Sequence, residues 1–291
     1  MNATMKYSDK PEQAFTVSTY AELHKFVQAF ADGHLNLLIL IGSAGLAKSQ
    51  SVRKAVGEGA CWIEGNATPF GIYNELYRRR GELVVIDDVD SLYTDRSAVR
   101  LLKCLCQTDP VKSVAWHSAA AGTEQLPREF KTTSRVVIIA NDWKTLDQNV
   151  AAVQDRGHLV IFEPSAEEVH QQVGQWFDDP HIYEWFGDHL HLIPNPSMRN
   201  YVRAKELQAS GINWVAHLLS EIPWKTRLVA ELRADPTYES EKDRIVEFTA
   251  RGAGSRATYF NVKRKLRLAA NPALNAMQSG ESSPKVKAKA A

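Results

Sequence analysis

The chain has 291 residues, of which 44% are hydrophobic and 24% charged, and its formal net charge is +1. This composition excludes a disordered chain and allows one large or two modest globular domains. The polar N-terminus lacks an apolar signal core and no apolar run reaches the length of a membrane span, so we expect a cytoplasmic protein without membrane contact. The three cysteines, Cys61, Cys104 and Cys106, are expected to be reduced thiols rather than metal ligands.

Short apolar segments alternate with helical patterns up to residue 164. We expect strands at 35–41, 60–64, 82–86, 111–118, 135–140 and 158–162. Helices are expected at 50–56, 72–80 and 97–106, and in a segment that ends near Arg156; the polar stretch before residue 135 is expected to be a loop or hairpin. This alternation predicts an α/β core at 1–164, in which helices flank a mainly parallel sheet.

Beyond Pro164 the pattern becomes helical. Helices are expected at 166–177, 182–189, 197–210 and 214–222, which predicts an all-helical lid at 165–234. A small basic helical module is expected at 235–270, followed by a disordered tail at 271–291. From Arg244 onward there are ten basic residues against two acidic ones, a charge of +8, so the positive charge gathers at this end.

The first strand runs into a glycine-containing turn typical of phosphate binding. Residues 42–49 match the P-loop pattern G-x-x-x-x-G-K-[ST] at every fixed position except Ala47, which replaces a glycine. The predicted nucleotide-binding residues are Gly42, Ser43, Ala44, Gly45, Leu46, Ala47, Lys48 and Ser49. Backbone N–H groups of such a loop converge on phosphate, Lys48 would contact the β- and γ-phosphates, and Ser49 would bind Mg²⁺. Ala47 is penalised only if its φ is positive.

Four later segments follow the order found in AAA+ ATPases, which the chain therefore resembles over about residues 15–222. Residues 83–88, Leu-Val-Val-Ile-Asp-Asp, resemble a Walker B strand, in which Asp87 would lie near Mg²⁺ and Asp88 would orient the attacking water. The family usually has glutamate at the second position. Residues 135–141 end in Asn141, similar to sensor 1. Taken alone, an acidic turn and a strand-ending asparagine are also common.

Two arginines complete the resemblance. Arg156 lies before the last core strand, as an arginine finger does, and Arg199 falls in the first turn of a lid helix, similar to sensor 2. The alternative for Arg156 is an exposed arginine at a helix end. The resemblance implies an enzyme that binds ATP and Mg²⁺ and hydrolyses ATP, and a homo-oligomeric ring, often a hexamer. Phe70 and Trp116 lie in segments that could face its central pore.

The basic module resembles a helix-turn-helix at residues 245–260, with Ser255 capping the second helix. The predicted DNA-binding residues are Arg256, Thr258, Asn261, Lys263 and Arg264. The alternatives are a basic helix that packs on the lid, or one that binds RNA or an acidic partner.

The leading hypothesis is a DNA-associated AAA+ ATPase with a role in replication, transposition or a phage or plasmid system. One alternative is a protein remodeller of the MoxR or chaperone type with an acidic client. Another is a nucleotide-dependent scaffold that hydrolyses slowly, which Ala47 and Asp88 would permit.

Overall fold

The computed structural model describes residues 13–65, 67–89, 95–117, 126–141, 153, 155–193 and 196–269. Contacts within the chain divide it into two compact units, Met1–Pro164 and Ser165–Ala291. The helix expected before Arg156 falls largely outside the described residues, and the tail expected at 271–291 falls wholly outside them.

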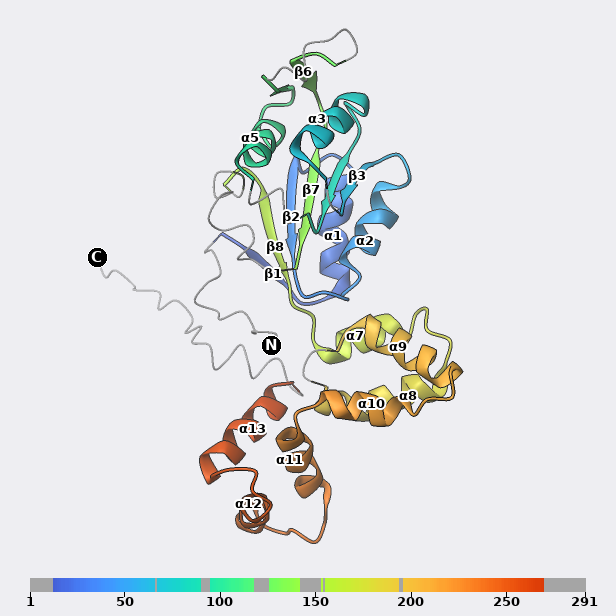
Figure 1. The fold of residues 1–291 in the computed structure, drawn as a ribbon, viewed down its shortest axis with the longest axis vertical. Coiled ribbons are helices and arrows are strands. Elements are labelled where there is room, and N and C mark those ends of the chain that lie inside the picture. Colours follow the sequence, from blue (N-terminus) through green and yellow to red (C-terminus); the bar gives the residue numbers. More distant parts are fainter. Residues whose placement is uncertain are drawn as a thin grey trace, which may run out of the picture. The chain divides into compact units, whose positions relative to one another are not determined.

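The first unit is built on a six-stranded sheet whose order is β1-β8-β2-β7-β4-β3, with every neighbouring pair parallel (Figure 1). Its strands are β1 (Phe15–Val17), β2 (Leu37–Ile41), β3 (Cys61–Glu64), β4 (Val84–Asp87), β7 (Val136–Ala140) and β8 (His158–Phe162). The central strands β2 and β7 are buried at every position, as a sheet covered on both faces requires. The predicted α/β fold with a parallel sheet flanked by helices is confirmed.

Helices cover both faces of this sheet: α1 (Tyr20–Ala31), α2 (Lys48–Val56), α3 (Pro69–Arg78) and α5 (Arg96–Leu105). Leu37, Ile39 and Ile41 share one core cluster with residues of α3 and α5. Because side chains alternate along a strand, Leu38 and Leu40 point to the opposite face, where Tyr20 of α1 packs on Phe162 of β8. The sheet is therefore the middle of three layers.

Three elements of this unit differ from the sequence prediction. The strand expected at 111–118 is β5 (Lys112–Ala115), which pairs antiparallel with β6 (Glu129–Thr132) outside the main sheet. Strand β1 was not predicted, because it has three residues with only one buried and presents no apolar run. Helix α1 was not predicted either, although Thr19 and Glu22 form a capping box at its start. Phe70 and Trp116 are partly buried against the core, with ring centroids 6.0 Å apart.

The second unit contains only helices among its described residues. Its first part comprises α7 (Ala166–Val173), α8 (Pro180–His189), the short 3₁₀ helix η2 (Leu190–Leu192), α9 (Met198–Ala209) and α10 (Trp214–Glu221). Aromatic rings hold these helices together, since Phe186 of α8 stacks on Tyr201 of α9 at 4.0 Å and on Trp214 of α10 at 6.3 Å.

The C-terminal part is a three-helix module formed by α11 (Trp224–Ala234), α12 (Glu241–Ala250) and α13 (Arg256–Ala269). Its core joins Leu228, Val229 and Leu232 of α11 to Phe248 and Tyr259 of the other two helices. Helix α11 was not predicted; it falls within the range 165–234 that was expected to form the lid, and it shares its core with α12 and α13. Among the described helices, none combines the length and apolar character needed to cross a bilayer.

Candidate nucleotide site

The register of the parallel strands brings three polar positions to one edge of the sheet. Ile41 of β2 pairs with Ala140 of β7, and Asp87 of β4 pairs with Ile139 of β7. The residues that follow these strands are Gly42, Asp88 and Asn141. Because β7 lies between β2 and β4, Asn141 lies between the glycine turn and the acidic pair. Ligand sites of parallel α/β sheets form at this carboxyl edge.

The glycine turn has the backbone expected of a phosphate-binding loop. Gly45 has φ 79° and Ala47 has φ 56° with ψ 26°, so both lie in the left-handed region. Ala47 is the N-cap of α2 and supplies no side-chain hydrogen bond to the first N–H groups of that helix. These donors, together with the positive end of the helix dipole, favour an anion.

The conformation of Ala47 answers the question raised by its sequence. A residue with a Cβ is strained in the left-handed region, where glycine is not. The P-loop motif has glycine at this position. Ala47 adopts the same left-handed conformation, so the loop keeps its shape at a conformational cost. Gly42 is constrained for another reason, because a Cβ placed there would lie 2.6 Å from the carbonyl oxygen of Phe162.

A chain of hydrogen bonds links Lys48 to the end of β4. The Lys48 Nζ donates to the carbonyl oxygens of Gly42 at 2.7 Å and Ser43 at 2.9 Å, and to Asn141 Oδ1 at 3.0 Å. Asn141 Nδ2 donates in turn to Asp88 Oδ2 at 2.9 Å. Asp88 has φ 54°, a second non-glycine residue in the left-handed region, and such strain clusters at functional sites.

Asp87 and Ser49 offer oxygen ligands beside this chain. Burial raises the pKa of the Asp87 carboxyl, as does the charge of Asp88, while a hydrogen bond from the Ser49 side chain acts in the opposite direction. A half-buried carboxylate whose charge is disfavoured gains from a nearby cation. One carboxylate and one hydroxyl suit Mg²⁺, which keeps most of its shell for water and phosphate oxygens.

Arg156 contacts a different part of the first unit. It follows Val153 in a turn that precedes β8, and its Nη1 donates to the carbonyl oxygen of Lys103 at 2.7 Å, near the end of α5. A guanidinium bound to the last carbonyls of a helix is favoured by the helix dipole. Its predicted role as a finger toward a neighbouring subunit stays a prediction.

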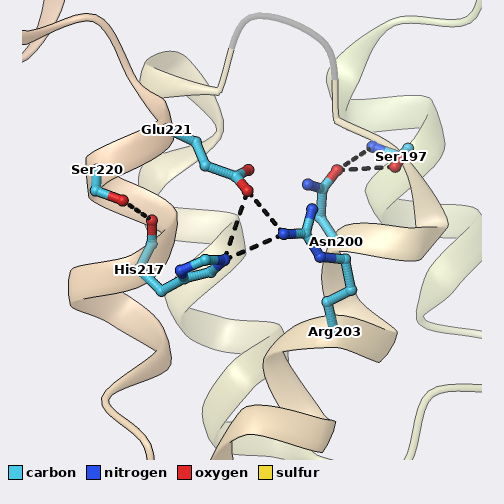
Figure 2. A network of polar contacts seen from close by, with 6 residues as sticks. All are labelled: Ser197, Asn200, Arg203, His217, Ser220 and Glu221. Carbon is cyan, nitrogen blue, oxygen red and sulfur yellow. Dashed lines mark hydrogen bonds and ion pairs between the residues drawn. The ribbon is translucent and has the colours of Figure 1, made fainter.

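Arg199 belongs to the second unit, where it is exposed in the first turn of α9. Figure 2 shows the polar contacts that other residues of this helix make. Ser197 and Asn200 cap the start of α9, with the Ser197 N–H donating to Asn200 Oδ1 at 2.8 Å. One turn later, Arg203 binds Glu221 of α10 at 2.7 Å and His217 at 3.1 Å. These contacts fix the helix that carries Arg199, and its sensor 2 role stays a prediction.

The five predicted DNA-binding residues of α13 fall into two groups. Arg256, Asn261 and Arg264 are exposed; Arg256 and Arg264 share one helical face with Phe260, which is 39% exposed, and Asn261 lies at the edge of that face. Lys263 instead forms an ion pair with Glu241 of α12 at 2.8 Å, and Thr258 packs against the turn at Gly254 and contacts Ser255.

The turn before α13 depends on its glycines. It spans 251–255, and Gly252 and Gly254 have φ of 71° and 129°, which other residues rarely adopt. Between them Ala253 is fully buried in the module core. The Thr258 N–H donates to the Ser255 hydroxyl at 3.4 Å, so Ser255 caps α13.

Sequence reasoning missed two residues that support these sites. Glu241 joins α12 to α13 through Lys263 and also binds Arg244. Tyr20 donates a hydrogen bond from its hydroxyl to the carbonyl oxygen of Leu46 in the glycine turn, at 3.2 Å. Neither belongs to a recognised spacing, and only the packing of distant segments reveals them.

Comparison with known proteins gives limited matches. No protein-family profile matches this chain. It is similar to an uncharacterized 36.7 kDa protein from the nrdC-mobD intergenic region of Enterobacteria phage T4, with 31% identity over 121 residues. That similarity covers 38% of this chain, and the chain spans 37% of the length of the phage protein.

Among solved structures, the chain is similar to NtrX of Brucella abortus. The ATP complex of NtrX gives a TM-score of 0.44 at 13% identity, covering 89% of this chain and 69% of NtrX. The ADP complex gives 0.39 at 11% identity, covering 57% of this chain and 41% of NtrX. Both TM-scores are below 0.5, so the functional assignment has to rest on the residues of this chain.

Proposed function

We propose that the protein is a P-loop ATPase of the AAA+ type that binds ATP with Mg²⁺ and hydrolyses it to ADP and phosphate. The observation that carries this proposal is the meeting of three strand ends, at which Lys48, Asn141 and Asp88 form one hydrogen-bonded chain beside Asp87 and Ser49.

Each of these residues has a distinct task. Lys48 exchanges its contacts with the carbonyls of its own loop for phosphate oxygens, which its ammonium group binds as a point charge. Asp88 accepts a proton from the attacking water, and Asn141 holds both that carboxylate and the lysine in place. Ser49 and Asp87 would hold Mg²⁺, which supplies neutralisation of the phosphate charge when bound.

The test is nucleotide binding and turnover by point variants. Lys48→Ala should abolish ATP turnover, whereas Lys54→Ala, an exposed lysine of the same helix, should leave it unchanged. Asp88→Asn should bind ATP without hydrolysing it. Turnover by Lys48→Ala at the wild-type rate would contradict the site.

We propose a ring of subunits on the basis of Arg156 alone. If Arg156 serves a neighbour, Arg156→Ala should remove hydrolysis without weakening ATP binding, and mixing it with Asp88→Asn subunits should restore part of the activity. Sedimentation with ATP and with ADP would give the size of the assembly. Loss of ATP affinity in the arginine variant would contradict a role across subunits.

A nucleotide-dependent scaffold is the second candidate function. It is favoured by the strained Ala47 and by Asp88, whose side chain is one methylene shorter than the usual glutamate and is held by Asn141. In this case ATP and Mg²⁺ change the assembly state while steady-state turnover stays at background. Measuring turnover together with sedimentation distinguishes the two functions.

We further propose that the C-terminal module binds DNA through the exposed face of α13. Arginine and asparagine are the side chains that pair with guanine and adenine edges in the major groove, and Arg256, Asn261 and Arg264 lie along this face. Lys263 is not among the proposed DNA-contacting residues, because its ion pair with Glu241 holds α12 and α13 together.

Binding to a DNA duplex at two salt concentrations tests this face in the full chain. Arg256→Ala combined with Arg264→Ala should weaken binding and flatten its salt dependence, whereas Lys242→Ala, an exposed lysine of α12, should have a much smaller effect. If the paired variant binds the duplex like wild type but loses an acidic protein client, the remodeller alternative replaces DNA binding.

A further inference from the structure

Tyr20 connects the N-terminal helix to the glycine turn of the nucleotide site. It is the first residue of α1 and is 3% exposed. Its hydroxyl donates to the carbonyl oxygen of Leu46 at 3.2 Å, and its ring packs edge-on against Phe162 with centroids 5.0 Å apart. Phe162 also lies against Gly42, so the first and last parts of the glycine turn are both in contact with this corner of the fold.

The position of Tyr20 is itself well determined. Thr19 caps α1, and Glu22 completes a reciprocal capping box with the backbone of Thr19. This fixes the first turn of the helix, in which Tyr20 lies. The tyrosine hydroxyl is therefore a stationary donor beside the loop.

The hydrogen bond determines which way one peptide group of the loop faces. In a trans peptide the C=O and N–H groups point in opposite directions. Because Tyr20 binds the Leu46 carbonyl, the N–H of Ala47 points away from Tyr20. With Gly45 and Ala47 both left-handed, this orientation forms the concave set of N–H donors that holds a phosphate.

Ala47 makes an external restraint on this peptide necessary. A glycine at this position adopts the left-handed conformation as readily as the right-handed one, whereas alanine prefers the latter. A neutral hydrogen bond of the Tyr20 type shifts a conformational equilibrium by about two- to tenfold, which is the same order as the preference of alanine.

We propose that Tyr20 is a positioning residue for nucleotide phosphates: its hydroxyl holds the Leu46–Ala47 peptide in the binding orientation that glycine would adopt unaided. The proposal rests on the assignment of the loop as an ATP site. Tyr20 lies outside the motif, and its role depends on the residue at position 47.

The test is the affinity of full-length Tyr20→Phe for ATP and for ADP, measured by calorimetry. Tyr20→Phe keeps the ring against Phe162 and removes only the donor. We expect affinity for both nucleotides to fall about fivefold. The matched control is Tyr73→Phe, which removes a buried tyrosine hydrogen bond to the carbonyl oxygen of Pro127 at 2.8 Å, and which should leave affinity unchanged.

A double-variant cycle with Ala47→Gly separates this role from a general loss of stability. In the Ala47→Gly background, Tyr20→Phe should weaken binding by less than about twofold, because the peptide no longer needs the restraint. Equal losses in both backgrounds, or no loss in Tyr20→Phe, would overturn the role of Tyr20 while leaving the ATP site intact. A wild-type protein that binds no nucleotide would overturn both.

Discussion

Replacing Ala47 with glycine is expected to stabilise the protein, although the same replacement destabilises most helices. Ala47 has φ 56° and ψ 26°, the left-handed conformation, at the N-cap of α2. This conformation costs a residue with a Cβ about 1–2 kcal/mol. Glycine removes that cost but adds freedom to the unfolded chain, worth roughly 0.4–1 kcal/mol. The free energy of unfolding should therefore rise by about 0.8 kcal/mol, within a range of roughly 0–1.6 kcal/mol.

The change should be visible in thermal and urea unfolding of the nucleotide-free protein. For a unit of this size, 1 kcal/mol corresponds to about 2–4 °C in Tm, so Ala47→Gly should raise Tm by roughly 1–4 °C. The matched control lies in the same helix: Ala55→Gly, eight residues later in the last turn of α2, should lower stability by roughly 0.5–1 kcal/mol because glycine is a poor helix residue.

Opposite signs for these two variants are the essential result. If Ala47→Gly destabilises the protein as much as Ala55→Gly does, Ala47 carries no strain in this loop. Glycine at position 47 also restores the full P-loop pattern, so the variant shows whether the natural alanine limits ATP turnover.

Four further variants test other parts of the structure. Asp87→Asn should stabilise the nucleotide-free protein near neutral pH and abolish Mg²⁺-dependent turnover. Burial raises the pKa of Asp87 in the folded protein above its ordinary value of 3.8. The stability of the wild-type protein should therefore fall as the pH rises from 3.8 to the folded-state pKa, and stay level above it. Unfolding curves from pH 3 to 8 should show that Asp87→Asn lacks this pH-dependent loss of stability. If the variant has the same pH profile as the wild type, the loss does not come from Asp87. Gly42→Ala should abolish nucleotide binding, because its Cβ would lie 2.6 Å from the Phe162 carbonyl oxygen. If a folded Gly42→Ala variant binds ATP normally in calorimetry, the loop does not depend on this close approach. Lys263→Ala should lower the thermal stability of the C-terminal module by breaking the ion pair with Glu241. Arg264→Ala should instead weaken DNA binding in titrations without affecting stability. The reverse pattern would indicate that Lys263, and not Arg264, contacts DNA.

The sequence by itself determined five of the six strands of the main sheet, all except β1, and the order of the site residues. Long buried runs such as those of β2 and β7 are strongly patterned, and a strand followed by a glycine turn and a lysine has few other interpretations. Parallel strands then place the residues after them at one edge, so the proximity of Asp88 and Asn141 follows from their positions directly after β4 and β7, and the glycine turn after β2 brings Lys48 to the same edge.

The tertiary structure decided the features that depend on conformation or on distant partners. A residue's φ is set by the loop around it, so the strain at Ala47 is not written in its identity. Likewise, Lys263 is basic in any sequence, and only the packing of α12 against α13 brings Glu241 within 2.8 Å of it. Tyr20 contacts the glycine turn because β1 and α1 pack beside β8, and such contacts between distant segments leave no local pattern for sequence reasoning to detect.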